Sequence, residues 1–339
     1  MSWEPPLPPP STPAPSPSPT VGWEAPTKAP WFGVMEQIRG GWRTYRAAAG
    51  ALIRIALVPQ AIQVILLVPV VLMTAAMLDG LIRAFGAFDF SAYAADPVAS
   101  QRTFQATIEA AVRPPPALAF WSGVVSGASL TLGLFNASLL TAGALAVLDG
   151  RRPSVLGSVR AVAACGDGIV APAIVLGMAW AVIGTPLEMT QTDAAFGTSG
   201  GSAAVGSLLG IAGFVIVIVA FVLAVRWSLA IPAILAEGLG LRAGLARSAA
   251  LTAGVRVQIG LALFVAGVAF SFIVGLLALV GGLIGFGVGG TIEAGVVGYL
   301  VAVAVAGVLV APIVPAMLAR NYRLRAAPAP VAPSAAVAA

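Results

Sequence analysis

The stretch that decides the fold is Arg226–Gly260, RWSLAIPAILAEGLGLRAGLARSAALTAGVRVQIG, which joins two apolar segments through a short basic linker. The first apolar run ends at Arg226, and the second resumes after three arginines, Arg242, Arg247 and Arg256. Lysine and arginine gather in this way on the cytoplasmic side of membrane-spanning helices. The stretch therefore predicts two spans that meet at a cytoplasmic surface.

The composition extends this prediction to the whole chain. Hydrophobic residues make up 59% of the 339 positions and charged residues only 9%, whereas a soluble domain has about 25% charged residues. The net charge is +5, but the basic residues flank apolar runs, so we expect an integral membrane protein with no nucleic-acid partner. Histidine is absent and Cys165 is the only cysteine, which excludes Cys/His zinc sites, histidine-based triads and an intrachain disulfide. We expect no cofactor.

The two ends of the chain differ from the part between them. Residues 1–30 are rich in proline and contain no apolar block of signal-peptide length, so a disordered tail is predicted there. The segment PPLPPP also fits a polyproline ligand, although an ordinary proline-rich terminus is the favoured interpretation. An Ala/Pro tail is predicted at 326–339. Residues 31–325 are expected to form one membrane domain.

Six apolar runs predict six membrane-spanning helices. They lie within 51–78, 117–148, 169–187, 206–225, 259–285 and 295–319, with a polar loop at 79–115 and a linker at 188–205. If both termini and the linkers 149–168 and 236–258 are cytoplasmic, only three of the 18 basic residues, Arg83, Arg102 and Arg113, fall outside. The positive-inside rule therefore favours an all-α fold of six spans with both termini in the cytoplasm.

A short helix is predicted before the first span, over residues 32–46. Val34, Ile38, Trp42 and Tyr45 recur at helical spacing on one face, which is typical of a helix that lies on the membrane surface. Its arginines have two interpretations, which are contact with anionic headgroups or a partner, and ordinary anchoring of the first span. The sequence leaves both open.

The chain also suggests a threefold repeat of a surface helix, a span and a long span. The pattern Gly-x-x-Arg occurs before each odd-numbered span, from Gly40 to Arg43, from Gly157 to Arg160 and from Gly244 to Arg247. Glycine occupies 39 positions, so short glycine matches also arise by chance. The repeat is therefore a hypothesis.

Two groups of residues are candidates for function. The first group is basic and is expected to bind membrane lipid with anionic headgroups or a protein partner in the membrane: Arg39, Arg43, Arg46, Arg151, Arg152, Arg160, Arg242, Arg247 and Arg256. The second group is polar and lies within predicted spans, where polar side chains need partners inside the protein: Arg54, Gln60, Gln63 and Asn136. No catalytic residues and no metal ligands are predicted.

The stretch RWSLAIPAILAEGLGLRAGLARS resembles the bacterial family of glycerophosphoryl diester phosphodiesterase membrane domains. A second match is VMEQIRGGWRTYRAAAGALIRIAL, before and within the first span, and together the matches cover most of 32–325. The residues that carry the resemblance are Trp42-Arg43, Tyr45-Arg46, Gly50, Arg226, Leu229-Ala230, Pro232-Ala233, Glu237-Gly238 and Arg247-Ser248. The resemblance implies a six-helix module in the bacterial cytoplasmic (inner) membrane. The family's soluble catalytic barrel uses histidines and a metal, and its chemistry is not expected here.

Two functions remain open on the sequence. The favoured one is a non-catalytic multi-pass module that anchors, scaffolds or regulates envelope or lipid-related partners. The alternative is a permease for small molecules or lipids, with a polar pathway inside the bundle. An enzyme is not expected, because acidic residues are nearly absent from the predicted spans and acid–base chemistry would lack a base.

Overall fold

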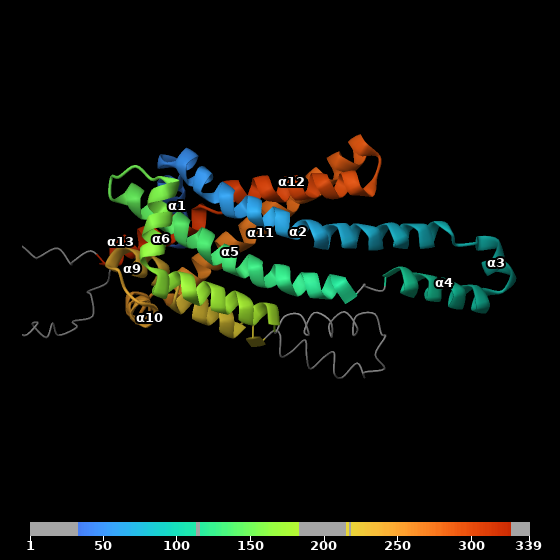
Figure 1. Cartoon of the computed structure of the whole chain (residues 1–339), viewed down its shortest axis with the longest axis horizontal. Coiled ribbons are helices and arrows are strands. Elements are labelled where there is room, and N and C mark those ends of the chain that lie inside the picture. The colour runs from blue at the N-terminus through green and yellow to red at the C-terminus, as the bar shows by residue number, and fades with distance from the viewer. Residues whose placement is uncertain (1–32, 113–115, 183–214, 217, 327–339) are drawn as a thin grey trace, which may run out of the picture. The chain divides into compact units, whose positions relative to one another are not determined.

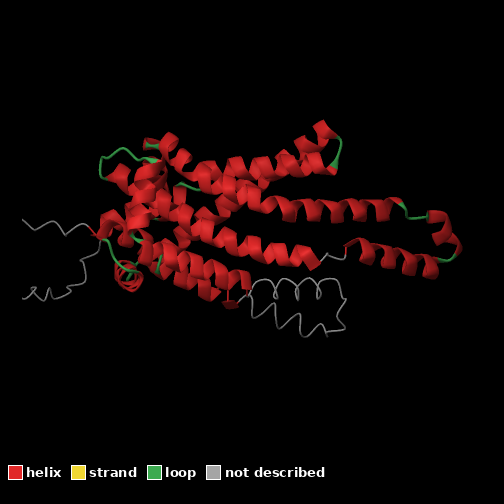
Figure 2. Ribbon diagram, viewed as in Figure 1, coloured by secondary structure: helices red, strands yellow, loops and turns green. Residues whose placement is uncertain are grey.

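A computed structural model describes residues 33–112, 116–182, 215–216 and 218–326. The regular structure in these ranges is helical, without strands (Figure 2). Five helices are long and apolar enough to cross a membrane, and six if the bent pair Val155–Ala164 and Gly166–Val182 counts as one span. The chain is therefore an all-α, multi-pass membrane protein. The predicted tail 1–30, the linker 188–205 and all but the first residue of the tail 326–339 lie outside the described residues.

The described residues 33–112 form four helices. Helix α1 (Val34–Ala47) is followed, after Ala48, by α2 (Ala49–Gly86). The 38 residues of α2 measure about 57 Å at 1.5 Å per residue, nearly twice the roughly 30 Å of a hydrocarbon core. Helices α3 (Phe90–Ala95) and α4 (Pro97–Val112) follow, and α4 packs beside α2 (Figure 1).

The prediction of a polar loop at 79–115 is wrong, because most of its described residues are helical and two of its aspartates begin helices. Asp89 Oδ1 accepts hydrogen bonds from the backbone N–H groups of Ser91 and Ala92 at 2.8 and 3.1 Å. Asp96 Oδ1 accepts from the N–H groups of Val98 and Ala99 at 3.1 and 3.0 Å. Each carboxylate satisfies donors that the first turn of a helix leaves without partners.

The predicted run at 117–148 is confirmed as helix α5 (Pro116–Leu148). Helix α6 (Val155–Ala164) then begins at Ser154, whose Oγ accepts from the Gly157 N–H at 3.1 Å, as the sequence predicts. The π-helical turn η1 (Gly166–Val170) leads into a helix that the structure describes as far as Val182. The axis bends by 84° between α6 and this helix.

The remaining helices begin with residues 218–226 and a turn at 227–229. Helices α9 (Ala230–Glu237), α10 (Leu241–Leu251), α11 (Arg256–Gly289), α12 (Ile292–Val310) and α13 (Ile313–Ala326) follow. The predicted sixth span is therefore two helices with a break at 311–312. Pro312 lies in this break and Pro315 in the first turn of α13, and proline has no N–H to continue the hydrogen bonding of a helix.

The main core lies where the surface helices meet the ends of the spans. Leu52, Leu140, Leu229 and Ala316, from four different segments, are fully or almost fully buried in one cluster. Helices α1, α6, α9, α10 and α13 gather around this part, while α2, α5, α11 and α12 run away from it (Figure 1). We call this part the basic end, because all nine candidate arginines lie in or beside its surface helices.

Candidate functional site

The basic end is organised around the last turns of α13, Arg320–Arg325, which we call the hub segment. It contacts three surface segments that are distant in the sequence: α1, the turn before α6, and the pair α9–α10. The sequence RNYRLR gives this short stretch of helix several long polar side chains, which point in different directions around the axis. One short segment therefore reaches all three neighbours.

The first surface segment, α1, is held by a buried hydrogen bond and an ion pair. Asn321 Nδ2 donates to Gln37 Oε1 at 2.9 Å, and both side chains are buried. Arg320 pairs with the Glu36 carboxylate at 3.4 Å and also donates to the Glu36 carbonyl. Gly40 makes this arrangement possible, because a Cβ atom there would overlap the guanidinium of Arg320.

The second surface segment is the turn between α5 and α6. The carboxylate of Asp149, directly after α5, accepts hydrogen bonds from Arg323 Nη2 at 2.8 Å and from Arg151 Nη2 at 2.9 Å. Arg323 is 174 residues away, whereas Arg151 is a near neighbour. The carboxylate therefore joins the turn to the hub segment.

The third surface segment is α9 with α10. Glu237 Oε1 accepts from Tyr322 Oη at 2.8 Å and from Arg247 Nε at 3.0 Å. Arg325 Nη1 also donates to the carbonyl of Leu251, the last residue of α10, at 3.3 Å. Within the segment, Ser248 Oγ links the chain around Arg226 by accepting from the Leu229 N–H and donating to the Arg226 carbonyl. The third segment is thus fixed both internally and to the hub segment.

The contacts of the three surface segments with the hub segment have the same arrangement. Each surface segment supplies a single carboxylate, Glu36, Asp149 or Glu237, and each carboxylate lies between an arginine of its own segment and a residue of the hub segment. These carboxylates are partly buried, with 26–35% of the side chain exposed. Charge-assisted hydrogen bonds in such places are stronger than exposed ion pairs. The arrangement fixes the relative positions of the three segments.

The structure divides the nine predicted arginines into two sets. Arg43, Arg151 and Arg247 pair with the carboxylates of their own segments, and Arg247 is half-buried. The other six are exposed and form no ion pair with any residue of the described ranges: Arg39, Arg46, Arg152, Arg160, Arg242 and Arg256. These six leave positive charge at the surface of the basic end.

The four polar residues predicted inside the bundle lie in different surroundings. Arg54 is exposed on α2, and Gln63 is half-buried on the same helix. The Gln60 amide lies against Gly307 of α12, where a Cβ atom would come within 2.9 Å of it. Asn136 is on α5, and its buried Oδ1 has no hydrogen-bond partner in the described structure. Of these four residues, Gln60 therefore lies at a helix contact, between α2 and α12.

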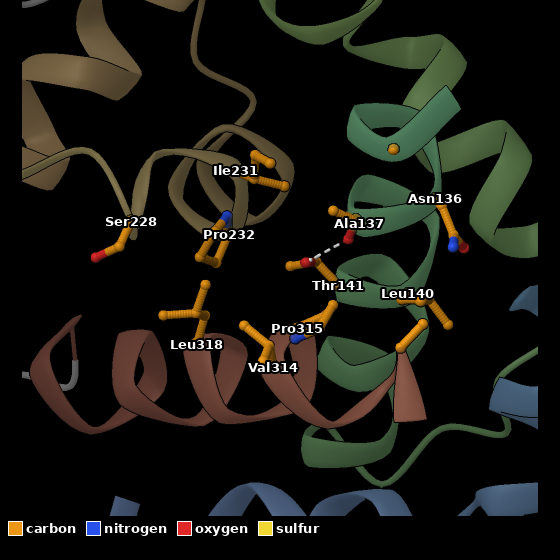
Figure 3. A pocket seen from close by; sticks show the side chains of 12 residues that line it. Asn136, Ala137, Leu140, Thr141, Ser228, Ile231, Pro232, Val314, Pro315 and Leu318 are labelled. Carbon is orange, nitrogen blue, oxygen red and sulfur yellow. Dashed lines mark hydrogen bonds between the residues drawn. The ribbon is translucent and has the colours of Figure 1, made fainter. Parts of the chain in front are cut away.

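A cavity of about 240 Å³ lies between α5, residues 228–232 and the beginning of α13. Figure 3 shows Ile231 and Pro232 opposite Ala137 and Thr141, with Asn136 on the other side of the α5 ribbon in this view. The Thr141 hydroxyl donates to the Ala137 carbonyl at 2.7 Å, and the Ser228 hydroxyl donates to the Val225 carbonyl at 2.9 Å. None of the described residues that line the cavity is charged, so it suits an apolar group.

The hub segment is the part of the site that the sequence analysis missed. Arg320, Arg323 and Arg325 follow an apolar run, so they resemble membrane-flanking charge alone. Two signals point further: Asn321 and Tyr322 interrupt the arginines with hydrogen-bonding groups, and the pair Gly40-Gly41 in an amphipathic helix marks a close helix contact. Among the described residues, no group of three or more cysteine or acidic side chains is placed to hold a metal ion.

No family model, curated protein or solved structure matches this chain. The resemblance to the membrane domain of glycerophosphoryl diester phosphodiesterases therefore stays a prediction.

Proposed function

We propose that the protein is a non-catalytic multi-pass membrane module that anchors, scaffolds or regulates envelope or lipid-related partners. One observation carries the proposal: the hub segment holds three surface segments in fixed positions through Glu36, Asp149 and Glu237. A scaffold requires such a fixed surface, because a partner then binds without first ordering its receptor. The six exposed arginines, which have no ion-pair partner among the described residues, supply the charge of that surface.

The proposal places the basic end in the cytoplasm of a bacterium, with both chain termini on that side of the inner membrane. The concentration of arginine at this end supports the orientation through the positive-inside rule. The order of the elements also supports a threefold repeat. Each of α1, α6 and α10 is a short helix that comes before an apolar one, as the repeat requires.

The test is photo-crosslinking of the full chain in cells, with a photoreactive amino acid in place of a single exposed residue. Val159 on α6 is 44% exposed at the basic end, and Val288 near the end of α11 is 86% exposed and serves as the control. We expect protein adducts at Val159 that are absent at Val288. Equal labelling at both positions, or no reproducible adduct at Val159, contradicts the proposal.

A lipid permease is the second candidate, and one observation favours it. The turn at 227–229 and the break at 311–312 both border the cavity beside α5. Interrupted helices are common at the binding sites of transporters. Proteoliposomes that contain the purified chain should then move lipid precursors or phosphodiesters across the bilayer. Equal transport in protein-free liposomes contradicts this candidate and leaves the scaffold proposal standing.

A further inference from the structure

The rotation of α1 about its own axis is fixed by the contact with α13. Gln37, Gly40, Gly41 and Thr44 are buried on one side of the helix. The hydrogen bond between Gln37 and Asn321 is specific to this rotation, and the two glycines let the helices approach closely. The opposite side of α1 must therefore face away from the protein.

That outward side differs from the apolar face expected from the sequence. Tyr45 joins the core with 7% exposure, whereas Trp42 remains 45% exposed, so the stripe of Val34, Ile38, Trp42 and Tyr45 does not form one face. The outward residues instead follow the spacing i, i+4, i+7 and i+11, which is one line along a helix. They are Met35, Arg39, Trp42 and Arg46, and we call them the outer stripe.

The outer stripe alternates apolar and basic side chains. Met35 is 57% exposed, and Arg39 and Arg46 are exposed without an acidic partner in the described structure. Glu36, the acidic residue of α1, is turned toward Arg320 of the hub segment. Tryptophan and methionine side chains fit the boundary between lipid headgroups and acyl chains, and arginine side chains at that level reach the lipid phosphates.

The position of α1 places the outer stripe at the depth of the lipid headgroups. Only Ala48 separates α1 from α2, and α2 is a candidate membrane span over Ala49–Gly86. Because α2 is longer than a hydrocarbon core, its membrane boundary is set by Arg54, an exposed charge that does not enter the lipid core. Helix α1 ends seven residues before Arg54 and therefore lies close to the headgroups. We propose that the outer stripe binds the phosphates of anionic phospholipids in the adjacent leaflet, with Trp42 and Met35 between the lipids. This names the partner of the basic end and thus rests on the proposed function.

The first experiment measures the depth of the stripe. A spin label is attached to the full chain carrying Met35→Cys and Cys165→Ser, in nanodiscs of phosphatidylcholine with or without phosphatidylglycerol. We expect the label to be more accessible to oxygen than to a water-soluble nickel chelate, and phosphatidylglycerol should increase the difference. A label that the nickel chelate reaches freely in both lipids overturns the proposal.

The second experiment measures lipid affinity. Native mass spectrometry counts phosphatidylglycerol molecules retained by the full chain and by the double variant Arg39→Gln/Arg46→Gln. Each arginine near an anionic leaflet contributes about fivefold to affinity, so the double variant should bind about thirtyfold more weakly. Arg102→Gln, an exposed arginine on α4, is the matched control and should leave the affinity unchanged. Equal affinity in the double variant overturns the proposal.

The two proposals fail in distinguishable ways. If protein adducts form at Val159 while the double variant keeps its affinity for phosphatidylglycerol, the scaffold stands and the lipid contact of α1 is refuted. If the double variant loses lipid while Val159 gives no adduct, the lipid contact stands and the scaffold proposal fails.

Discussion

The basic end and the pair α11–α12 are held together by different kinds of contact. At the basic end, polar side chains such as Gln37 and Asn321 meet in buried hydrogen bonds. In α11–α12, Gly281 and Gly285 lie directly against the backbone of α12 at Gly298 and Ala294. Between helices in lipid, apolar side chains gain little by leaving the lipid, so association depends on close packing. Near the headgroups, buried hydrogen bonds between polar side chains can also make the pairing of two helices specific.

The largest effect is expected when a side chain is introduced at the close contact between the backbones of α11 and α12. A Cβ atom at Gly285 would overlap the carbonyl oxygen of Ala294, which is backbone and has little freedom to move. We expect Gly285→Val to destabilise the protein by about 3 kcal/mol, as overpacking does. The measurement is the free energy of unfolding in mixed detergent micelles, followed by circular dichroism.

The control for this variant lies on the same helix. Gly275 has open space around the position of a Cβ atom, so Gly275→Val introduces the same side chain without the overlap. The two variants should differ by most of the expected destabilisation. Equal unfolding free energies would show that α11 and α12 do not depend on this contact.

The buried hydrogen bond of the basic end is tested by replacing Gln37. Replacement by leucine removes the acceptor of the Asn321 amide, and a buried donor without its partner costs about 2 kcal/mol. The double variant Gln37→Leu/Asn321→Leu should recover part of this loss, because both polar groups are then gone. Gln63→Leu, at a half-buried position of α2, is the control. Additive losses in the double variant would contradict a specific coupling between the two residues.

These two regions also show how far the sequence predicts the structure. Continuous apolar runs identified α5 and α11 because length and hydropathy suffice for a span. The Ser154 cap identified α6 because capping is a local interaction. The hub segment could not be predicted in the same way. Arg320 and Glu36 are 284 residues apart, and the residues around either one do not indicate that the two form an ion pair.

The rotation of α1 was also beyond the sequence pattern. Hydrophobic periodicity treats Gly40 and Gly41 as neutral, but their lack of a side chain makes their face the one that packs on α13. The helices at 79–112 were missed for the opposite reason. Their aspartates favour a loop by composition, whereas Asp89 and Asp96 act as helix caps.

A smaller effect is expected from one hydrogen bond of the basic end. Tyr322→Phe removes the hydroxyl that donates to Glu237, but Arg247 still pairs with that carboxylate. The expected loss is about 1 kcal/mol, which is typical of a single hydrogen bond. Tyr299→Phe, at a 47% exposed tyrosine of α12, is the control. A loss as large as that of Gln37→Leu would show that the third surface segment depends on Tyr322 more than on Arg247.

The smallest effect is expected far from both regions, at the exposed cap of α3. The pKa of the Asp89 carboxyl is lowered by the hydrogen bond from the Ser91 hydroxyl, and further by the N–H groups of Ala92 and Ser91. Since the folded pKa lies below the unfolded value, the cap stabilises α3 above the unfolded pKa, and this stabilisation is lost as the pH falls through the folded pKa. Amide hydrogen exchange at Ala92 and Tyr93, corrected for the intrinsic effect of pH, should show the first turn of α3 opening in acid. Asp89→Asn keeps an acceptor at the cap without a titrating group, so its exchange should lack this dependence. If the asparagine variant opens over the same pH range, protonation of Asp89 is not the cause.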